Sequence, residues 1–372
     1  MLLTIVSFII VLSVLVLIHE LGHFLTAKKL GVKVEEFGFG FPPRIYGKKI
    51  GETLYSINLL PIGGFVKLYG EDDAGAGKVS LSKSQRPTTK DQTRAYFTRP
   101  VWQRGAIVVA GVIMNFLLAV AIISYLYSVP GVPTAGDKVT IAQLVPGAPA
   151  QKAGLHIGDT ITAINKTPIT LADQVSTLVK KNLGHPIVIQ IKNQKNQTST
   201  IAVIPRTHYP SNQGALGIVM SNNNILKKYP WYEAPIRGTI DSLQQSWMIV
   251  QGLGKLVNEV AVKREVPQDV AGPIAIAQLT GQFAQYGFNS LLSLVALLSL
   301  NLAVVNILPI PALDGGRFFF ILIEAITRWK IPSEVEGRVN AIGMIVLLGL
   351  IVLITFHDIF RLFTGQPLLP KM

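Results

Sequence analysis

Residues 2–25, LLTIVSFIIVLSVLVLIHELGHFL, are the stretch that decides how this chain is organised. The only ionisable residues in the stretch are His19, Glu20 and His23, which lie near its end. Because a helix of about 20 apolar residues crosses a bilayer, the stretch predicts a transmembrane helix. Ionisable side chains are costly in hydrocarbon, so their presence indicates a functional site within the span.

The whole sequence has the composition of a multi-pass membrane protein. Its 372 residues are 49% hydrophobic and only 15% charged, against about 25% charged in soluble domains, and the mean hydropathy is +0.42. Three further apolar stretches predict spans at residues 105–129, 291–308 and 340–356. Charged residues interrupt residues 240–260 too closely for a span, so this segment predicts an amphipathic helix on the membrane surface.

Two features of the composition restrict which residues can bind a metal and which partners are expected. The chain has no cysteine, so any metal must bind His, Asp or Glu. The net charge of +13 is compatible with nucleic-acid binding. An excess of Lys and Arg is also typical of cytoplasmic loops, and this interpretation is preferred because the spans are present. We therefore expect the lipid bilayer, and no nucleic acid, as a partner.

The distribution of Lys and Arg predicts the orientation in the membrane. Residues 26–104 hold 14 of the 34 basic residues, and the segment between the third and fourth spans holds Arg317, Arg328, Lys330 and Arg338. Cytoplasmic loops carry this excess. We therefore expect both termini and residues 130–290 on the side of the membrane opposite the cytoplasm. The first span has no basic segment before it, unlike a signal peptide, so it is expected to stay in the mature protein.

The sequence His19-Glu20-Leu21-Gly22-His23 is an H-E-x-x-H motif. On a helix, residues four apart share a face, so both imidazoles can reach one ion, and Glu20 is a candidate general base. A catalytic zinc usually has three protein ligands and one open position. The motif therefore predicts a hydrolytic zinc site near the cytoplasmic end of the first span.

The third zinc ligand must come from elsewhere in the chain. Asp314, Glu324 and Asp358 are the acidic residues next to the other spans. Asp358 follows the fourth span and is expected on the opposite side of the membrane, whereas Glu324 falls within a further predicted helix. Asp314 follows the third span on the same side as the histidines, and it is the preferred ligand.

The segment NILPIPALDGG, residues 306–316, resembles the N-x-x-P-x-P-x-L-D-G signature of site-2 proteases, the M50 family of intramembrane zinc metalloproteases. With the H-E-x-x-H motif, it is similar to the regulator-of-sigma-E branch of that family, over nearly the whole chain. The resemblance implies that Asp314 completes the zinc site and that Asn306 and Asn301 contact the substrate backbone. Alternatively, both asparagines are hydrogen-bonding residues between packed helices.

Two shorter motifs agree with the same branch. Residues 60–71, LPIGGFVKLYGE, resemble its membrane-reentrant β-loop, and Gly111 with Asn115 matches its G-x-x-x-N motif. Asn115 is therefore a candidate substrate-binding residue, with interhelical packing as the alternative. Within the loop, residues 56–60 or 63–68 are expected to offer a strand edge to the substrate. Alternatively, the loop is an ordinary cytoplasmic hairpin.

Residues 130–207 resemble a PDZ domain through the segment PGAPAQKAGLHIGDTI, residues 146–161. Alternating apolar residues predict strands at 139–145, 161–164, 187–191 and 198–204, with a helix at 171–183. PDZ domains bind peptides by adding a strand to a sheet edge. One such domain is present, whereas proteobacterial members of the branch carry two. Its expected role is a size filter for substrates, or alternatively the capture of a newly cut C-terminus.

The expected fold is a multi-pass α-helical membrane protein of about four transmembrane helices, with a membrane-associated β-loop and an inserted extracytoplasmic PDZ-like α+β domain. The expected division is 1–129 with the β-loop at 32–70, the PDZ-like domain at 130–207, an amphipathic-helix region at 208–289, and the last two spans at 290–372. The resemblance implies a location in the cytoplasmic (inner) membrane of a bacterium. It also implies intramembrane proteolysis of transmembrane proteins already trimmed by another protease, for example anti-sigma factors or signal-peptide remnants. The weighed alternatives are a metal transporter and a catalytically inactive scaffold.

Overall fold

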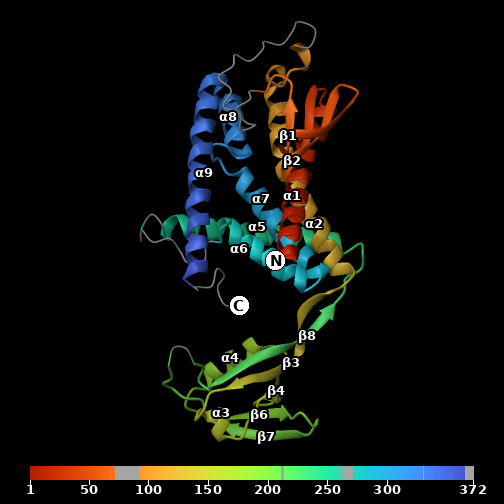
Figure 1. Ribbon diagram of the computed structural model, residues 1–372. Coiled ribbons are helices and arrows are strands. Elements are labelled where there is room, and N and C mark those ends of the chain that lie inside the picture. Colours follow the sequence, from red (N-terminus) through yellow and green to blue (C-terminus); the bar gives the residue numbers. More distant parts are fainter. Residues whose placement is uncertain (72–91, 211–212, 260–261, 263–270, 330, 365–372) are drawn as a thin grey trace. The chain divides into compact units, whose positions relative to one another are not determined.

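The computed structural model describes residues 1–71, 92–210, 213–259, 262, 271–329 and 331–364 (Figure 1). The chain forms two compact units. The first, the membrane unit, consists of Met1–Leu126 and Pro230–Met372. The second, the insert, consists of Tyr127–Tyr229.

Among the described residues, four helices are long and apolar enough to cross a membrane. They are α1 (Leu2–Lys29), α2 (Val101–Ser128), α7 (Phe288–Ile307) and α9 (Ser333–Phe363). Large apolar side chains are exposed along all four, as expected for surfaces that face lipid rather than water. The predicted four-span architecture is confirmed, with each helix longer at one or both ends than its apolar stretch.

The predicted β-loop forms a hairpin of two long antiparallel strands, β1 (Val34–Ile50) and β2 (Thr53–Leu68). Both strands bend. Residues 34–39 pair with 64–68 on one side, and residues 36–39 also pair with 54–57 on the other side. Residues 44–50 pair in turn with 53–58. The hairpin is therefore a small sheet in which residues 64–68 have one paired neighbour, whereas residues 54–57 lie between two.

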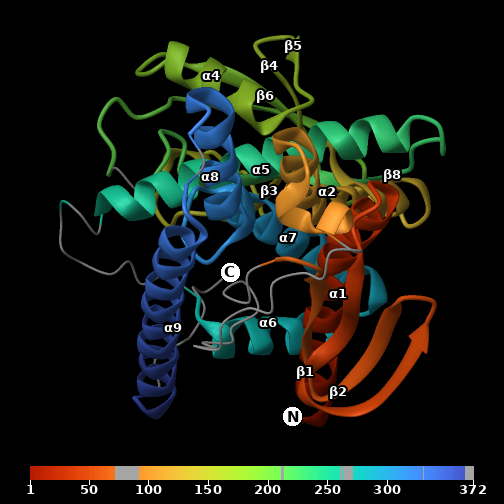
Figure 2. The same ribbon diagram turned by 90° about the horizontal axis from the view of Figure 1, so that it is seen from above.

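The hairpin lies against α1, as Figures 1 and 2 both show. The hydroxyl of Ser13, in the first half of α1, donates a hydrogen bond to the carbonyl oxygen of Pro61 at 2.8 Å. Phe24, Val34 and Leu68 belong to one buried cluster at the other end of the contact. The strand that includes residues 61–68 thus runs along the half of α1 that carries the H-E-x-x-H motif.

Between the insert and the third span, the described part of the chain includes α5 (Ala234–Asn258) and α6 (Pro273–Gln285). The predicted position of α5 on the membrane surface stays a prediction. The helix exposes a series of large apolar residues: Ile236, Ile240, Leu243, Trp247, Met248, Val250 and Val257. Helix α6 contacts the start of α1, where Gly281 packs against Thr4, and the last part of α9, where Ala275 N–H donates to Asp358 Oδ2 at 3.1 Å. The start of α1 and the end of α9 therefore lie on one side. Residues 260–261 and 263–270 of the predicted 208–289 region lie outside the described residues.

The insert is a sheet with two helices. Its strands are β3 (Val132–Leu144), β4 (Thr160–Ile164), β5 (Thr167–Pro168), β6 (Ile187–Lys192), β7 (Thr198–Val203) and β8 (Ile218–Lys227), and its helices are α3 (Pro149–Lys152) and α4 (Ala172–Lys181). The order is β7-β6-β4-β3-β8, with β5 paired to β4. Ile141, Ile161, Ile187 and Ile189 are buried in its core. The β-rich insert agrees with the predicted architecture.

The compact unit extends past residue 207, the predicted end of the domain. Strand β8 supplies the difference, because it pairs with β3 along most of its length. Its polar run at residues 221–224, SNNN, interrupts the apolar alternation by which the other strands were recognised. Tyr229 N–H donates to the carbonyl oxygen of Tyr127 at 3.0 Å, so the two ends of the insert meet.

Candidate metal centre

The histidines of the H-E-x-x-H motif lie one turn apart on α1 and converge with one carboxylate. The Nε2 atoms of His19 and His23 are 3.2 Å apart. Oδ2 of Asp314 lies 2.9 Å from the first and 3.3 Å from the second. These three residues form a group whose ligand atoms all lie within 4.8 Å of one another. Two imidazoles and one carboxylate are a donor set that suits zinc, with a fourth position left open for water or substrate.

The turn between α7 and α8 (Asp314–Thr327) brings Asp314 to the histidines. Ala312 adopts a left-handed conformation with φ of 74°, and its N–H donates to Oδ1 of Asn340 at 3.2 Å. A Cβ on Gly315 would lie 2.0 Å from the carbonyl oxygen of Leu308. A Cβ on Gly316 would lie 2.4 Å from the carbonyl oxygen of Ile310. The L-D-G-G sequence therefore permits a tight turn that places Asp314 in the first turn of α8.

The other two acidic candidates have different partners. Glu324 Oε1 accepts a hydrogen bond from Nη2 of Arg104 at 2.6 Å, and Asp358 accepts one from the α6 backbone. Asp314 is thus the candidate that the structure brings to both histidines, as the order of the spans predicted. Its role as the third zinc ligand is part of the proposed function.

Two ion pairs that no sequence motif predicted hold α8 in place. Arg104, at the start of α2, pairs with Glu324, and Arg317 pairs with Glu71, which follows the hairpin. Burial by itself lowers the pKa of Arg317, but Glu71, together with Tyr96 and Glu336, raises it above its usual value, so the guanidinium stays charged. Since each pair joins segments more than 200 residues apart, no local pattern reveals them. Arg317 lies in the first turn of α8, so its pair with Glu71 holds the end of the helix that carries Asp314. Glu324 pairs with Arg104 near the opposite end of α8.

Glu20 lies on α1 beside the hairpin. Its Cγ is 3.6 Å from the position that a Cβ on Gly64 would take. Gly64 is paired with Phe39 on one side, within the segment 64–68 that has one paired neighbour. Glu20, the candidate base, therefore faces residues 64–68 of the hairpin. Because Gly64 has no side chain, space is left between this strand and the Glu20 carboxylate.

The three predicted asparagines occupy different surroundings. Asn115 on α2 is fully buried, and its Nδ2 lies 3.3 Å from Nδ1 of His19. Asn301 on α7 is partly buried, and its Nδ2 donates to the carbonyl oxygen of Leu297 at 2.9 Å. Asn306 lies in the last turn of α7 and is also partly buried. The structure thus brings Asn115 to the metal group, whereas substrate contacts of Asn301 and Asn306 stay predictions.

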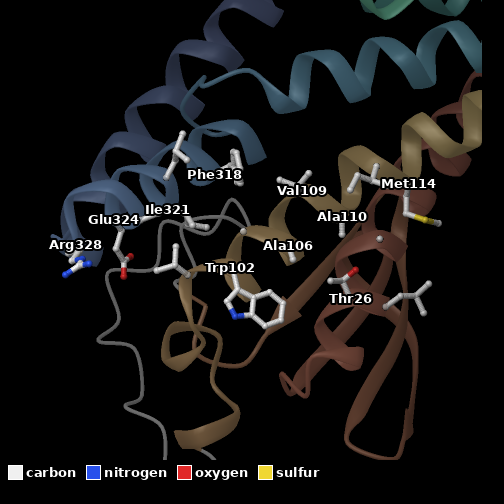
Figure 3. Close-up of a pocket in the computed structure, with 17 residues that line it drawn as sticks. Thr26, Trp102, Ala106, Val109, Ala110, Met114, Phe318, Ile321, Glu324 and Arg328 are labelled. Carbon is white, nitrogen blue, oxygen red and sulfur yellow. The ribbon is translucent and has the colours of Figure 1, made fainter. Parts of the chain in front are cut away.

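A separate groove of about 1220 Å³ lies between α1, α2 and α8 (Figure 3). Its lining is mostly apolar and includes Trp102, Val109, Met114 and Phe318, with Glu324 and Arg328 at one end. His19, Glu20, His23 and Asp314 do not line it. The groove is therefore distinct from the metal centre, and its apolar lining suits hydrocarbon.

The described residues include four helices that can span a membrane, and one of them carries an H-E-x-x-H motif whose histidines meet the carboxylate of Asp314. These features define an intramembrane zinc metalloprotease. The profile of peptidase family M50 matches residues 7–350, and the chain belongs to this family. The predicted family, enzyme class and zinc cofactor are confirmed.

Relatives of the same kind align over almost the whole chain. A Clostridium perfringens protein, provisionally named a zinc metalloprotease, is 36% identical over 93% of this chain and 96% of its own length. The regulator of sigma-W protease RasP of Bacillus subtilis is 32% identical over 97% of this chain and 99% of its own. A PDZ domain of an SdrC-like protein from Listeria monocytogenes aligns with 24% of this chain and 93% of that domain, at 20% identity and a TM-score of 0.21.

Proposed function

We propose that this protein hydrolyses peptide bonds within or next to transmembrane segments of membrane proteins, using zinc held by His19, His23 and Asp314, with Glu20 as the general base. The observation that carries the proposal is the convergence of the three ligand atoms within a membrane unit. Zinc bound there would lower the pKa of a water molecule towards about 7 and polarise the scissile carbonyl.

The residues of the chain divide the remaining work. The Glu20 carboxylate accepts a proton from the attacking water and donates it to the leaving amine. A substrate helix keeps its carbonyls in intrahelical hydrogen bonds, and hydrocarbon offers no replacement. An unwound substrate can instead add as a strand to residues 64–68, whose register gives them one paired neighbour. Residues 56 and 57 are already paired on both sides. This pairing favours residues 63–68 over residues 56–60 as the strand edge that the substrate joins.

The substrate and its orientation are part of the same proposal. Asn306 and Asn301 would contact the unwound substrate backbone. The zinc site would lie towards the cytoplasmic side of a bacterial inner membrane, with both termini and the insert outside. The excess of basic residues in 26–104 supports this orientation. Helix α6 contacts both the start of α1 and the end of α9, which supports the placement of both termini on the same side.

Metal-dependent cleavage by the purified protein tests the proposed function. A chelator should abolish cleavage of a model membrane substrate in liposomes, and added zinc should restore it. Asp314→Asn should lower the zinc content well below one ion per chain, whereas Glu324→Gln, a matched carboxylate-to-amide change on the same helix, should retain zinc. Equal zinc in wild type and Asp314→Asn, or zinc flux into liposomes without cleavage, would contradict the proposal.

The insert is proposed to act as a size filter that rejects substrates still carrying a bulky outside domain. A folded unit of about 100 residues has a radius of gyration near 13 Å, comparable to the width of a helix bundle. Capture of a newly cut C-terminus at a sheet edge is the alternative, since β8 is an edge strand.

Replacing residues 132–227 by a short Gly/Ser link separates the two roles of the insert. Because Tyr127 and Tyr229 are hydrogen-bonded, a short link can close the gap. A filter predicts new cleavage of untrimmed substrates in a gel assay. Capture predicts slower cleavage of trimmed ones instead. If the folded deletion protein still refuses untrimmed substrates, the filter role is rejected.

A further inference from the structure

Helix α2 meets the two histidines at three positions spaced one turn apart. The carbonyl oxygen of Ile107 accepts a hydrogen bond from Nδ1 of His23 at 2.8 Å. Gly111 faces both rings, because a Cβ there would lie 2.4 Å from Nε2 of His23 and 2.8 Å from Cε1 of His19. The carboxamide of Asn115 meets Nδ1 of His19. Residues four apart share one helix face, so this face of α2 forms the back wall of the metal centre.

The two Nδ1 atoms need hydrogen-bond acceptors when zinc is bound. The Nε2 atoms of both histidines face Asp314, which makes Nε2 the ligand atom of each ring. A neutral imidazole that binds metal through Nε2 carries its proton on Nδ1. A backbone carbonyl can only accept, so Ile107 fits this requirement at His23. His19 requires an equivalent acceptor.

The carboxamide of Asn115 can supply that acceptor. It offers a donor, Nδ2, and an acceptor, Oδ1, and rotation of the amide exchanges their positions. Nδ2 lies 3.3 Å from Nδ1 of His19, while Oδ1 is buried with no hydrogen-bond partner among the described residues. Rotation places Oδ1 against the Nδ1–H of His19. The buried oxygen that had no partner then gains one, at the ring that needs an acceptor.

The backbone around Asn115 is held independently of its side chain. Ser299 on α7 donates its hydroxyl proton to the carbonyl oxygen of Asn115 at 2.8 Å, and both residues are fully buried. A buried side chain behind His19 is poorly placed to contact substrate. The geometry therefore disfavours the substrate-binding role that the G-x-x-x-N motif suggested for Asn115.

We propose that Asn115 is a positioning residue of the zinc site, whose Oδ1 accepts the Nδ1–H of His19 and so fixes the orientation and the tautomer of this ligand. The inference rests on the proposed ligand set of His19, His23 and Asp314. Hydrogen-bond partners of this kind typically change metal affinity by about 10- to 100-fold when they are removed.

Zinc affinity of the purified full-length protein tests this role. The dissociation constant is measured by competition with a chelator of known affinity in wild type, Asn115→Leu and Asn115→Asp. Asn115→Leu removes the acceptor, and zinc binding should weaken by about 10- to 100-fold. Asn115→Asp keeps an acceptor at the same place, so its zinc affinity should stay close to the wild-type value. A purely structural role for the side chain would not produce this rescue by Asp.

Ser299→Ala is the matched control, because it removes a buried hydrogen bond to Asn115 but leaves the carboxamide intact, and its zinc affinity should stay near wild type. If Asn115→Leu does not fold, Asn115→Ala replaces it. Unchanged zinc affinity without the acceptor, or an equal loss in Asn115→Asp, overturns the inference. Asp314→Asn is measured in parallel. If it retains zinc, the proposed ligand set fails instead, so the two failures are distinguishable.

Discussion

Glu20→Gln is expected to reduce kcat for a membrane substrate by at least about 10²- to 10⁴-fold, the usual contribution of general acid–base catalysis. The amide has nearly the same shape as the carboxylate, but it cannot accept the proton of the attacking water. Zinc content should stay at the wild-type level, because the ligand atoms come from His19, His23 and Asp314. Cleavage assays combined with metal analysis by mass spectrometry measure both effects on one preparation.

The matched control for this change is Glu233→Gln. Glu233 precedes α5 and forms a salt bridge with Arg237 at 2.6 Å, and it belongs neither to the metal group nor to the hairpin, so its loss should leave kcat largely unchanged. Loss of zinc in Glu20→Gln would show that Glu20 is a ligand. Retention of most cleavage activity would remove it from the proposed mechanism.

Gly111→Ala is expected to abolish high-affinity zinc binding, and cleavage with it. The added Cβ would lie 2.4 Å from Nε2 of His23 and 2.8 Å from Cε1 of His19, closer than atoms can approach without a shift. Because both rings also contact α2 through their Nδ1 atoms, they cannot move away without breaking those contacts. The measurement is zinc content after equilibration at limiting free zinc.

Gly105→Ala is the control on the same helix. A Cβ at this position would lie 3.4 Å from Cε2 of Phe318, an ordinary contact distance. The two variants make the same change in helix propensity, which favours Ala over Gly by about 1 kcal/mol. Full zinc occupancy in Gly111→Ala would show that the histidines are not seated against α2.

The sequence predicted the four spans and the convergence of His19, His23 and Asp314 for simple physical reasons. Span length follows from bilayer thickness, and a four-residue spacing places two histidines on one helix face. The order of spans then places Asp314 on the same side as these histidines. These rules need only the hydropathy of each stretch, the helical period and the fact that each span takes the chain to the other side of the membrane. All three can be read along the sequence without knowledge of tertiary contacts.

Other features depend on tertiary pairing that no local pattern encodes. Strand β8 carries a polar run, and its place in the sheet follows from pairing with β3 about 80 residues earlier. The hairpin register, which leaves residues 64–68 with one paired neighbour, depends on bends in both strands. The contacts of His19 with Asn115 and of His23 with Ile107 likewise join separate helices. A G-x-x-x-N pattern alone does not show which of its neighbours the asparagine will meet.

X-ray absorption spectroscopy at the zinc edge of the purified full-length protein tests the central claim most directly. The account predicts one zinc per chain, with two imidazole nitrogens at about 2.0–2.1 Å and oxygen ligands at about 2.0–2.2 Å. Asp314→Asn should lose or alter the oxygen shell while Glu324→Gln leaves the spectrum unchanged. A wild-type spectrum with one imidazole or none, or one unaffected by Asp314→Asn, would contradict the assignment of His19, His23 and Asp314 as the zinc site.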